Sequence, residues 1–65
     1  MNGLWYVGRN IGKIGNTLYY SKIEALEYIK EGQILTHYHT SQKYTAYIYK
    51  SKELQYIMRN IIYKG

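Results

Sequence analysis

The chain has 65 residues, a formal net charge of +5, and neither cysteine nor proline. This length allows one small domain, residues 1–65, with a thin hydrophobic core and a stability on the order of a few kcal/mol. The lack of cysteine excludes disulfides and thiolate metal sites and agrees with a cytoplasmic location. No apolar run approaches the roughly 20 residues that span a membrane, and no secretory leader is expected.

The first predicted element is a β-hairpin. Residues 4–7 and 17–20 are short runs of strand-forming side chains. The segment between them, 12–16, contains two glycines and an asparagine, which supply the positive-φ positions of tight turns. The sequence therefore predicts two antiparallel strands at the N-terminal end of the domain.

A helix over residues 22–31 is predicted next. Ser21 and Glu24 form a capping box, in which a serine side chain accepts from the backbone three residues later. Gly32 stands where a left-handed residue commonly ends a helix. An apolar stripe at helical spacing completes the pattern, formed by Ile23, Ala25, Leu26 and Ile29.

The second half repeats this order. Residues 34–40 and 44–50 predict a second hairpin around the loop 41–43. Ser51 can cap a second helix, whose amphipathic face would carry Leu54, Ile57, Met58 and Ile61. The predicted fold is α+β, in the order β-β-α-β-β-α: a small antiparallel sheet of two hairpins with two helices packed on one face.

Strand alternation sorts the second hairpin into two faces. A three-residue loop sets one group of side chains together, which we expect to face the helices: Ile34, Thr36, Tyr38, Tyr44, Ala46 and Ile48. The open face would then carry Leu35, His37, His39, Thr45, Tyr47 and Tyr49. A four-residue loop would flip one strand and bury both histidines, at a higher cost.

The open face is the predicted binding surface. The chain has ten tyrosines and no phenylalanine, so its aromatic positions are expected to meet water or a partner through their hydroxyls. All four glutamates fall in the predicted helices, which leaves the sheet with cationic residues alone. The candidate partner-binding residues are Tyr47, Tyr49, His37, His39, Lys43 and Lys50. Base stacking, a protein interface and simple cross-strand pairing that stabilises the sheet all fit this set.

No catalytic, cofactor or metal site is predicted. His37 and His39 share a strand face, but zinc needs a third or fourth ligand, and the chain has no cysteine and no other histidine. The glycines at 8, 12 and 15 lack the Gly-Lys-Ser/Thr of a phosphate loop. Without aspartate, no Ser-His-Asp set is recognisable, so the sequence favours a protein that is not an enzyme.

The stretch from Trp5 to Ile29 loosely resembles AP2-like arm-binding domains in its order of strand, Gly turn, strand and Ser-capped helix with Glu24-Ala25. Those domains read DNA with a small sheet backed by a helix, although their third strand is not evident here before the helix. The AT-rich residue usage also resembles that of small phage or mobile-element proteins. We expect a small regulator or inhibitor that docks on a host protein, with nucleic acid as the alternative partner, no membrane partner, and a homodimer left open.

Overall fold

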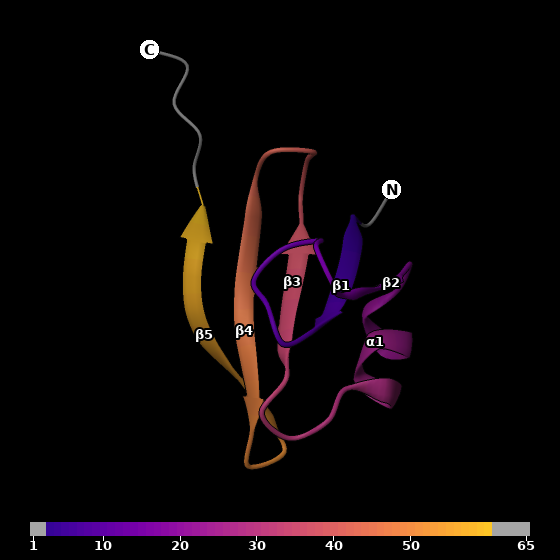
Figure 1. The fold of residues 1–65 in the computed structure, drawn as a ribbon, viewed down its shortest axis with the longest axis vertical. Helices are drawn as coiled ribbons and strands as arrows, with labels where there is room; N and C mark the ends of the chain where they lie inside the picture. Colours follow the sequence, from indigo (N-terminus) through magenta and orange to yellow (C-terminus); the bar gives the residue numbers. More distant parts are fainter. Residues whose placement is uncertain (1–2, 61–65) are drawn as a thin grey trace.

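One antiparallel sheet and one helix form the domain, and the computed structural model describes residues 3–60 (Figure 1). The order of elements is β-β-α-β-β-β, and the sheet runs β2-β1-β3-β4-β5. The elements are β1 (Leu4–Gly8), β2 (Thr17–Tyr19), α1 (Lys22–Tyr28), β3 (Ile34–Tyr38), β4 (Tyr44–Lys50) and β5 (Glu53–Asn60). The predicted α+β class and the two hairpins are confirmed.

The predicted second helix is wrong, because residues 53–60 form β5. Ser51 and Lys52 have φ values of 57° and 63°, so they form a two-residue hairpin turn instead of a helix cap. Positive φ at both central residues is the pattern of the turn that matches strand twist best. Pairing with β4 along its whole length outweighs the local helical spacing of Leu54, Ile57 and Met58. Ile61, the last member of that spacing, lies outside the described residues.

The first helix forms where the capping box predicted it. The Ser21 hydroxyl accepts from the Glu24 N–H at 3.1 Å, and α1 ends at Tyr28 with Ile29 as its C-cap, earlier than the predicted residue 31. Gly32 has a φ of +86° in the turn that follows. The Glu31 carboxylate there accepts from the Ser51 N–H at 3.0 Å, which ties the connection after α1 to the turn between β4 and β5.

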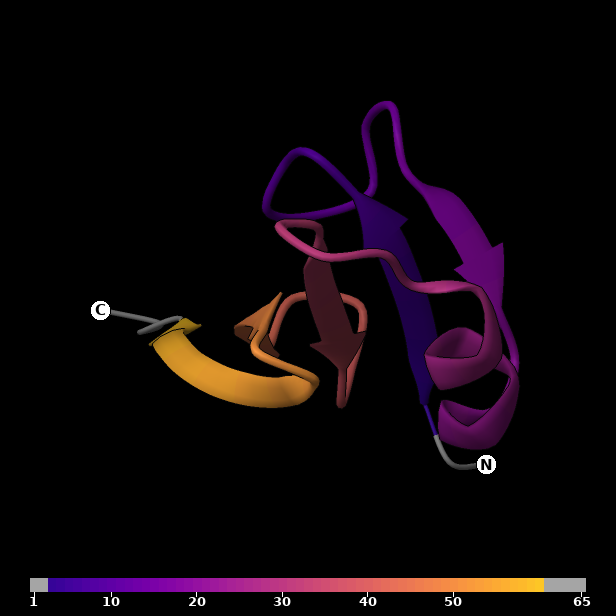
Figure 2. The ribbon, with the colours of Figure 1, turned by 90° about the horizontal axis from the view of Figure 1, so that it is seen from below.

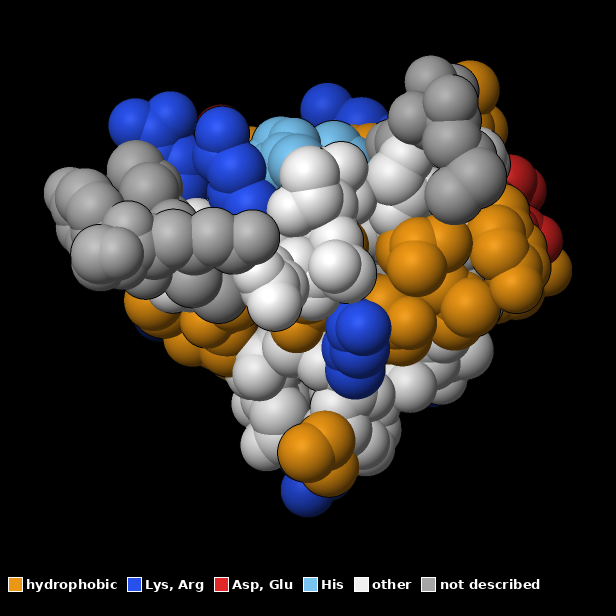
Figure 3. All heavy atoms as spheres, turned by 90° about the horizontal axis from the view of Figure 1, so that it is seen from above, with side chains coloured by type: hydrophobic (Ala, Val, Ile, Leu, Met, Phe, Trp, Pro, Cys, Tyr) orange, Lys and Arg blue, Asp and Glu red, His pale blue; other side chains and the backbone are white. Residues whose placement is uncertain are grey.

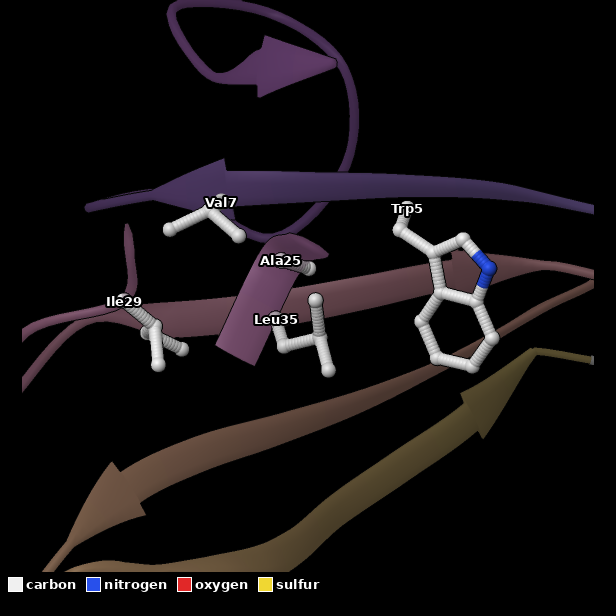
Figure 4. Packing of buried hydrophobic residues seen from close by; sticks show 5 residues of the cluster. All are labelled: Trp5, Val7, Ala25, Ile29 and Leu35. Carbon is white, nitrogen blue, oxygen red and sulfur yellow. The ribbon is translucent and has the colours of Figure 1, made fainter. Parts of the chain in front are cut away.

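The hydrophobic core lies between α1 and the face of the sheet opposite to the one predicted. Its buried residues are Trp5, Val7, Ala25, Ile29 and Leu35 (Figure 4). The predicted grouping of side chains across β3 and β4 is confirmed, with Thr36 opposite Ala46, although the connection spans 39–43 and is longer than the predicted 41–43. The predicted inward face was nevertheless wrong, since Trp5 and Val7 on β1 lie beside His37 and Leu35 and share their face. The helix follows the first hairpin directly and packs on β1 and β2, so it covers that face.

The other face of the sheet is covered by the loop at 9–16. The Gly12 N–H donates to the buried Thr36 hydroxyl at 2.9 Å, and the Lys13 ammonium lies 4.9 Å from the centre of the Tyr38 ring. Figure 2 shows this loop and α1 on opposite sides of the sheet. Both helices were predicted to pack on one face, whereas the structure has one helix on one face and a loop on the other, and both faces remain only partly covered.

Candidate functional site

A shallow hollow of about 440 Å³ lies on the helix side of the sheet, over β4 and β5. We call it the basic hollow, and its lining residues are His39, Lys43, Thr45, Tyr47, Tyr56 and Arg59. Lys43 and Arg59 are the charged residues in this lining, and both are cations. Figure 3 shows Lys and Arg side chains gathered beside the histidines on one side of the molecule. An anionic group is the complementary occupant of such a surface.

The pairing of β4 with β5 assembles this hollow. Thr45 is opposite Arg59 and Tyr47 is opposite Tyr56, so the four side chains share one face. The ring centres of Tyr47 and Tyr56 are 6.3 Å apart, with the planes at 76°. Tyr47 packs against the hydrophobic core, whereas 63% of Tyr56 is exposed. Tyr56 is therefore an accessible ring that Tyr47 supports from below.

A row of rings positions the histidines. His37 stacks on Trp5 with ring centres 3.6 Å apart and planes within 3°. His39 meets the edge of His37, with their ring centres 4.5 Å apart. The His39 Nε2 lies 2.8 Å from the hydroxyl oxygen of the buried Thr45. These contacts hold His39 at the wall of the hollow and place His37 between His39 and the core.

Partial burial lowers the pKa of His39 below its ordinary value of 6.5. The neighbouring His37, Lys43 and Arg59 lower this pKa further, because each disfavours a second positive charge nearby. His39 is therefore neutral at neutral pH and acts there as a hydrogen-bonding group. Lys43 and Arg59 supply the positive charge of the hollow.

The structure brings together three of the six predicted binding residues, namely His39, Lys43 and Tyr47. Tyr49 packs against the core, and His37 lies in the ring stack. The predicted set was expected to lie on an open face, but that face is the one that α1 partly covers. Lys50 lies at the far end of β4, opposite Glu53.

Sequence reasoning missed Tyr56 and Arg59, since both were assigned to the second helix. Had residues 53–60 been predicted as a strand after a two-residue turn, alternation would have placed Tyr56 beside Tyr47. It would have set Arg59 on the other face, because the bulge that brings Arg59 opposite Thr45 is not evident in the spacing. The prediction that the sheet carries no carboxylate is also wrong, because Glu53 was assigned to the second helix and lies on β5. The lining of the basic hollow itself contains none.

Two further findings concern residues 3–60. No group of three or more His, Cys, Asp or Glu side chains in this range lies close enough to hold a metal ion. None of its helical segments is both long enough and apolar enough to cross a membrane.

Comparison with known proteins gives no relative. No protein-family model, no curated protein and no solved structure matches the chain. The resemblance of residues 5–29 to AP2-like domains therefore implies no membership in that family.

Proposed function

We propose that this chain is a non-enzymatic binding protein, a small regulator or inhibitor that docks on an acidic surface of another protein through the basic hollow. The observation that carries the proposal is the lining itself, in which two cations and an exposed tyrosine share one hollow and no carboxylate is present. Cations that face a complementary acidic surface orient the partner and raise the rate of association.

Tyr56 would supply the area that is buried on docking. Tyrosine is favoured at protein interfaces because it offers a large, rigid surface with few rotamers to immobilise. Its exposed fraction of 63% leaves most of the ring available to a partner. The hollow is open and shallow, which suits a convex macromolecular surface better than an enclosed small molecule.

The contacts of His39 support a binding role over a catalytic one. Its Nε2 is engaged with the Thr45 hydroxyl, and Thr45 is only 6% exposed. Little of Thr45 is open to a substrate, so this pair is poorly placed to act as a nucleophile and its base. Its contribution is to fix the wall of the hollow.

Nucleic acid is the second candidate partner, and the exposed Tyr56 in the same hollow as two cations favours it. A base stacked on an aromatic ring contributes about 1–3 kcal/mol, with phosphates held by neighbouring cations. Two phosphate contacts would give affinity for a single strand a salt slope of about −1.5 on logarithmic axes. A protein partner held mainly by tyrosine burial would respond less steeply.

A retention experiment with charge-matched variants tests the proposal. The double variant Lys43→Glu/Arg59→Glu should lose a partner that the wild-type protein retains from lysate. Lys22→Glu/Lys30→Glu changes the net charge equally at two exposed positions outside the hollow and should keep that partner. Loss of the partner after nuclease treatment would assign it to nucleic acid. Equal retention by both double variants would refute a role for the hollow.

A further inference from the structure

One edge of the sheet is long and open. β5 is the outermost strand on its side and has eight residues, whereas the opposite edge strand, β2, has three and lies next to α1 (Figure 1). No further strand among residues 3–60 lies beside β5. An edge strand presents a row of unpaired N–H and C=O groups, which is a template for another strand.

β5 carries few of the features that protect such an edge. It has no proline, and its four central residues, 55–58, are uncharged. Its protective feature is a bulge, where the pairing with β4 passes from Tyr56 to Met58 and skips Ile57. The bulge sits in mid-strand and leaves ladder positions on both sides of it, and Ile57 is 39% exposed.

We propose that a second copy of this chain pairs with that edge, β5 against β5, antiparallel about a two-fold axis between Tyr56 and Ile57. The two five-stranded sheets would then join into one. Tyr56 would face Ile57 of the second copy and Gln55 would face Met58. At the ends, Leu54 would face Arg59 and Glu53 would face Asn60.

Three features of the strand favour this partner. In the proposed register no two like charges are opposite each other, whereas a parallel arrangement would set Glu53 against Glu53. Because of the bulge, the opposing pairs on either side of it also keep to one face of the sheet, with Gln55 and Met58 on the side opposite the core and Leu54 and Arg59 on the core side. Since only one edge is long and open, the contact closes as a dimer and does not extend into a filament.

The size of the domain points to the same partner. A chain this small buries only about 60% of the surface that its unfolded form exposes, and such domains often gain stability by oligomerisation. The chain has no disulfide to supply that stability. Tyr56 and Arg59 stand on β5, so the dimer would place two basic hollows side by side.

Sedimentation equilibrium over a range of concentrations tests the dimer. The wild-type protein should reach twice its 7.8 kDa mass. Ile57→Lys would place two like charges beside the axis and should raise the dimer dissociation constant at least tenfold, with unchanged circular dichroism. Ile23→Lys alters a residue on α1 that is 75% exposed and should leave the dimer intact. A wild-type protein that stays monomeric, or equal effects of the two variants, would overturn the proposal.

Two single-cysteine variants, Ile57→Cys and Ile23→Cys, keep the test valid if Ile57→Lys fails to fold. The chain has no cysteine, so Ile57→Cys introduces a single thiol. Mild oxidation should join two copies through this position, and should do so much more slowly in Ile23→Cys. Equal rates would contradict pairing through β5. The outcome is separate from that of the basic hollow, because Lys43→Glu should change partner retention and leave the mass of the dimer unchanged.

Discussion

Lys52→Gly gives opposite results for the hairpin turn seen in the structure and for the helix that the sequence predicts. Lys52 has a φ of 63° and an exposed side chain. A left-handed conformation costs an L-residue about 1–2 kcal/mol, and glycine removes that cost. Glycine also gives the unfolded chain more freedom, which offsets roughly 0.5–1 kcal/mol. We expect the variant to be about 0.5–1 kcal/mol more stable than the wild type.

Urea unfolding followed by the fluorescence of Trp5 measures this change, because Trp5 is the sole tryptophan and lies in the core. In thermal unfolding the same gain corresponds to a midpoint about 2–8 °C higher for a domain of this size. Lys50→Gly is the matched control, since Lys50 lies in β4 opposite Glu53, and glycine within a strand costs about 0.5–1 kcal/mol.

The refuting result is a loss of stability in Lys52→Gly. In the first turn of a helix, glycine would cost up to about 1 kcal/mol relative to a good helix former such as lysine. Losses of stability of similar size in Lys50→Gly and Lys52→Gly would therefore support a helix in place of the turn. A gain at 52 together with a loss at 50 is expected from the turn alone.

Two further predictions concern the core and the histidines. Leu35→Ala removes a side chain with no exposed surface and should cost about 2–5 kcal/mol of stability, enough to unfold much of the protein. Ile23→Ala, at an exposed position, should change stability by less than about 0.5 kcal/mol. Equal losses of stability in urea unfolding would contradict the position of the core. The pKa of His39 is lower in the folded protein than its ordinary 6.5, so the unfolded chain takes up the proton first as the pH falls. Protonation of His39 therefore favours the unfolded state, and the stability that the neutral His39 contributes is present above pH 6.5 and lost below it. The urea midpoint should fall between pH 7.5 and 5.5 and do so less in His39→Gln; a midpoint that rises on acidification would refute the argument.

Local signals in the sequence were sufficient for the first part of the fold. Ser21 and Glu24 marked the start of α1, and strand alternation grouped the side chains of β3 and β4 correctly, although the loop between them is longer than the predicted 41–43. The segment after Ser51 failed because Leu54 and Met58 satisfy a helical period, while the partner that decides for a strand is the edge of β4. Sequence spacing does not contain that contact.

The candidate binding surface was predictable only in part, for a related reason. Alternation correctly grouped Tyr47 with His39, but it could not tell which face the helix would cover. That choice depends on Trp5 and Val7, which the pairing of β1 with β3 brings to the same face as Leu35. Tyr56 and Arg59 then joined the surface from β5, a strand whose existence was not predicted.

The tyrosine bias of the chain follows largely from how thin this fold is. Among the nine tyrosines within residues 3–60, none is buried: Tyr6, Tyr19, Tyr38, Tyr44, Tyr47 and Tyr49 are half-buried, and Tyr20, Tyr28 and Tyr56 are exposed. One short helix covers part of one face and a loop covers part of the other, so each of these rings keeps a route for its hydroxyl to water.

Trp5, which is buried, shows the cost of burying the polar group of an aromatic side chain. Its indole N–H has no hydrogen-bond partner among the described residues, and an unsatisfied buried donor costs about 1–3 kcal/mol. Half-buried tyrosines avoid that cost while still covering the sheet with apolar surface. Most of the tyrosines therefore need no partner to explain them. Tyr56 differs because its exposed ring lies in the same hollow as Lys43 and Arg59, and it is therefore the tyrosine that we propose contacts a partner.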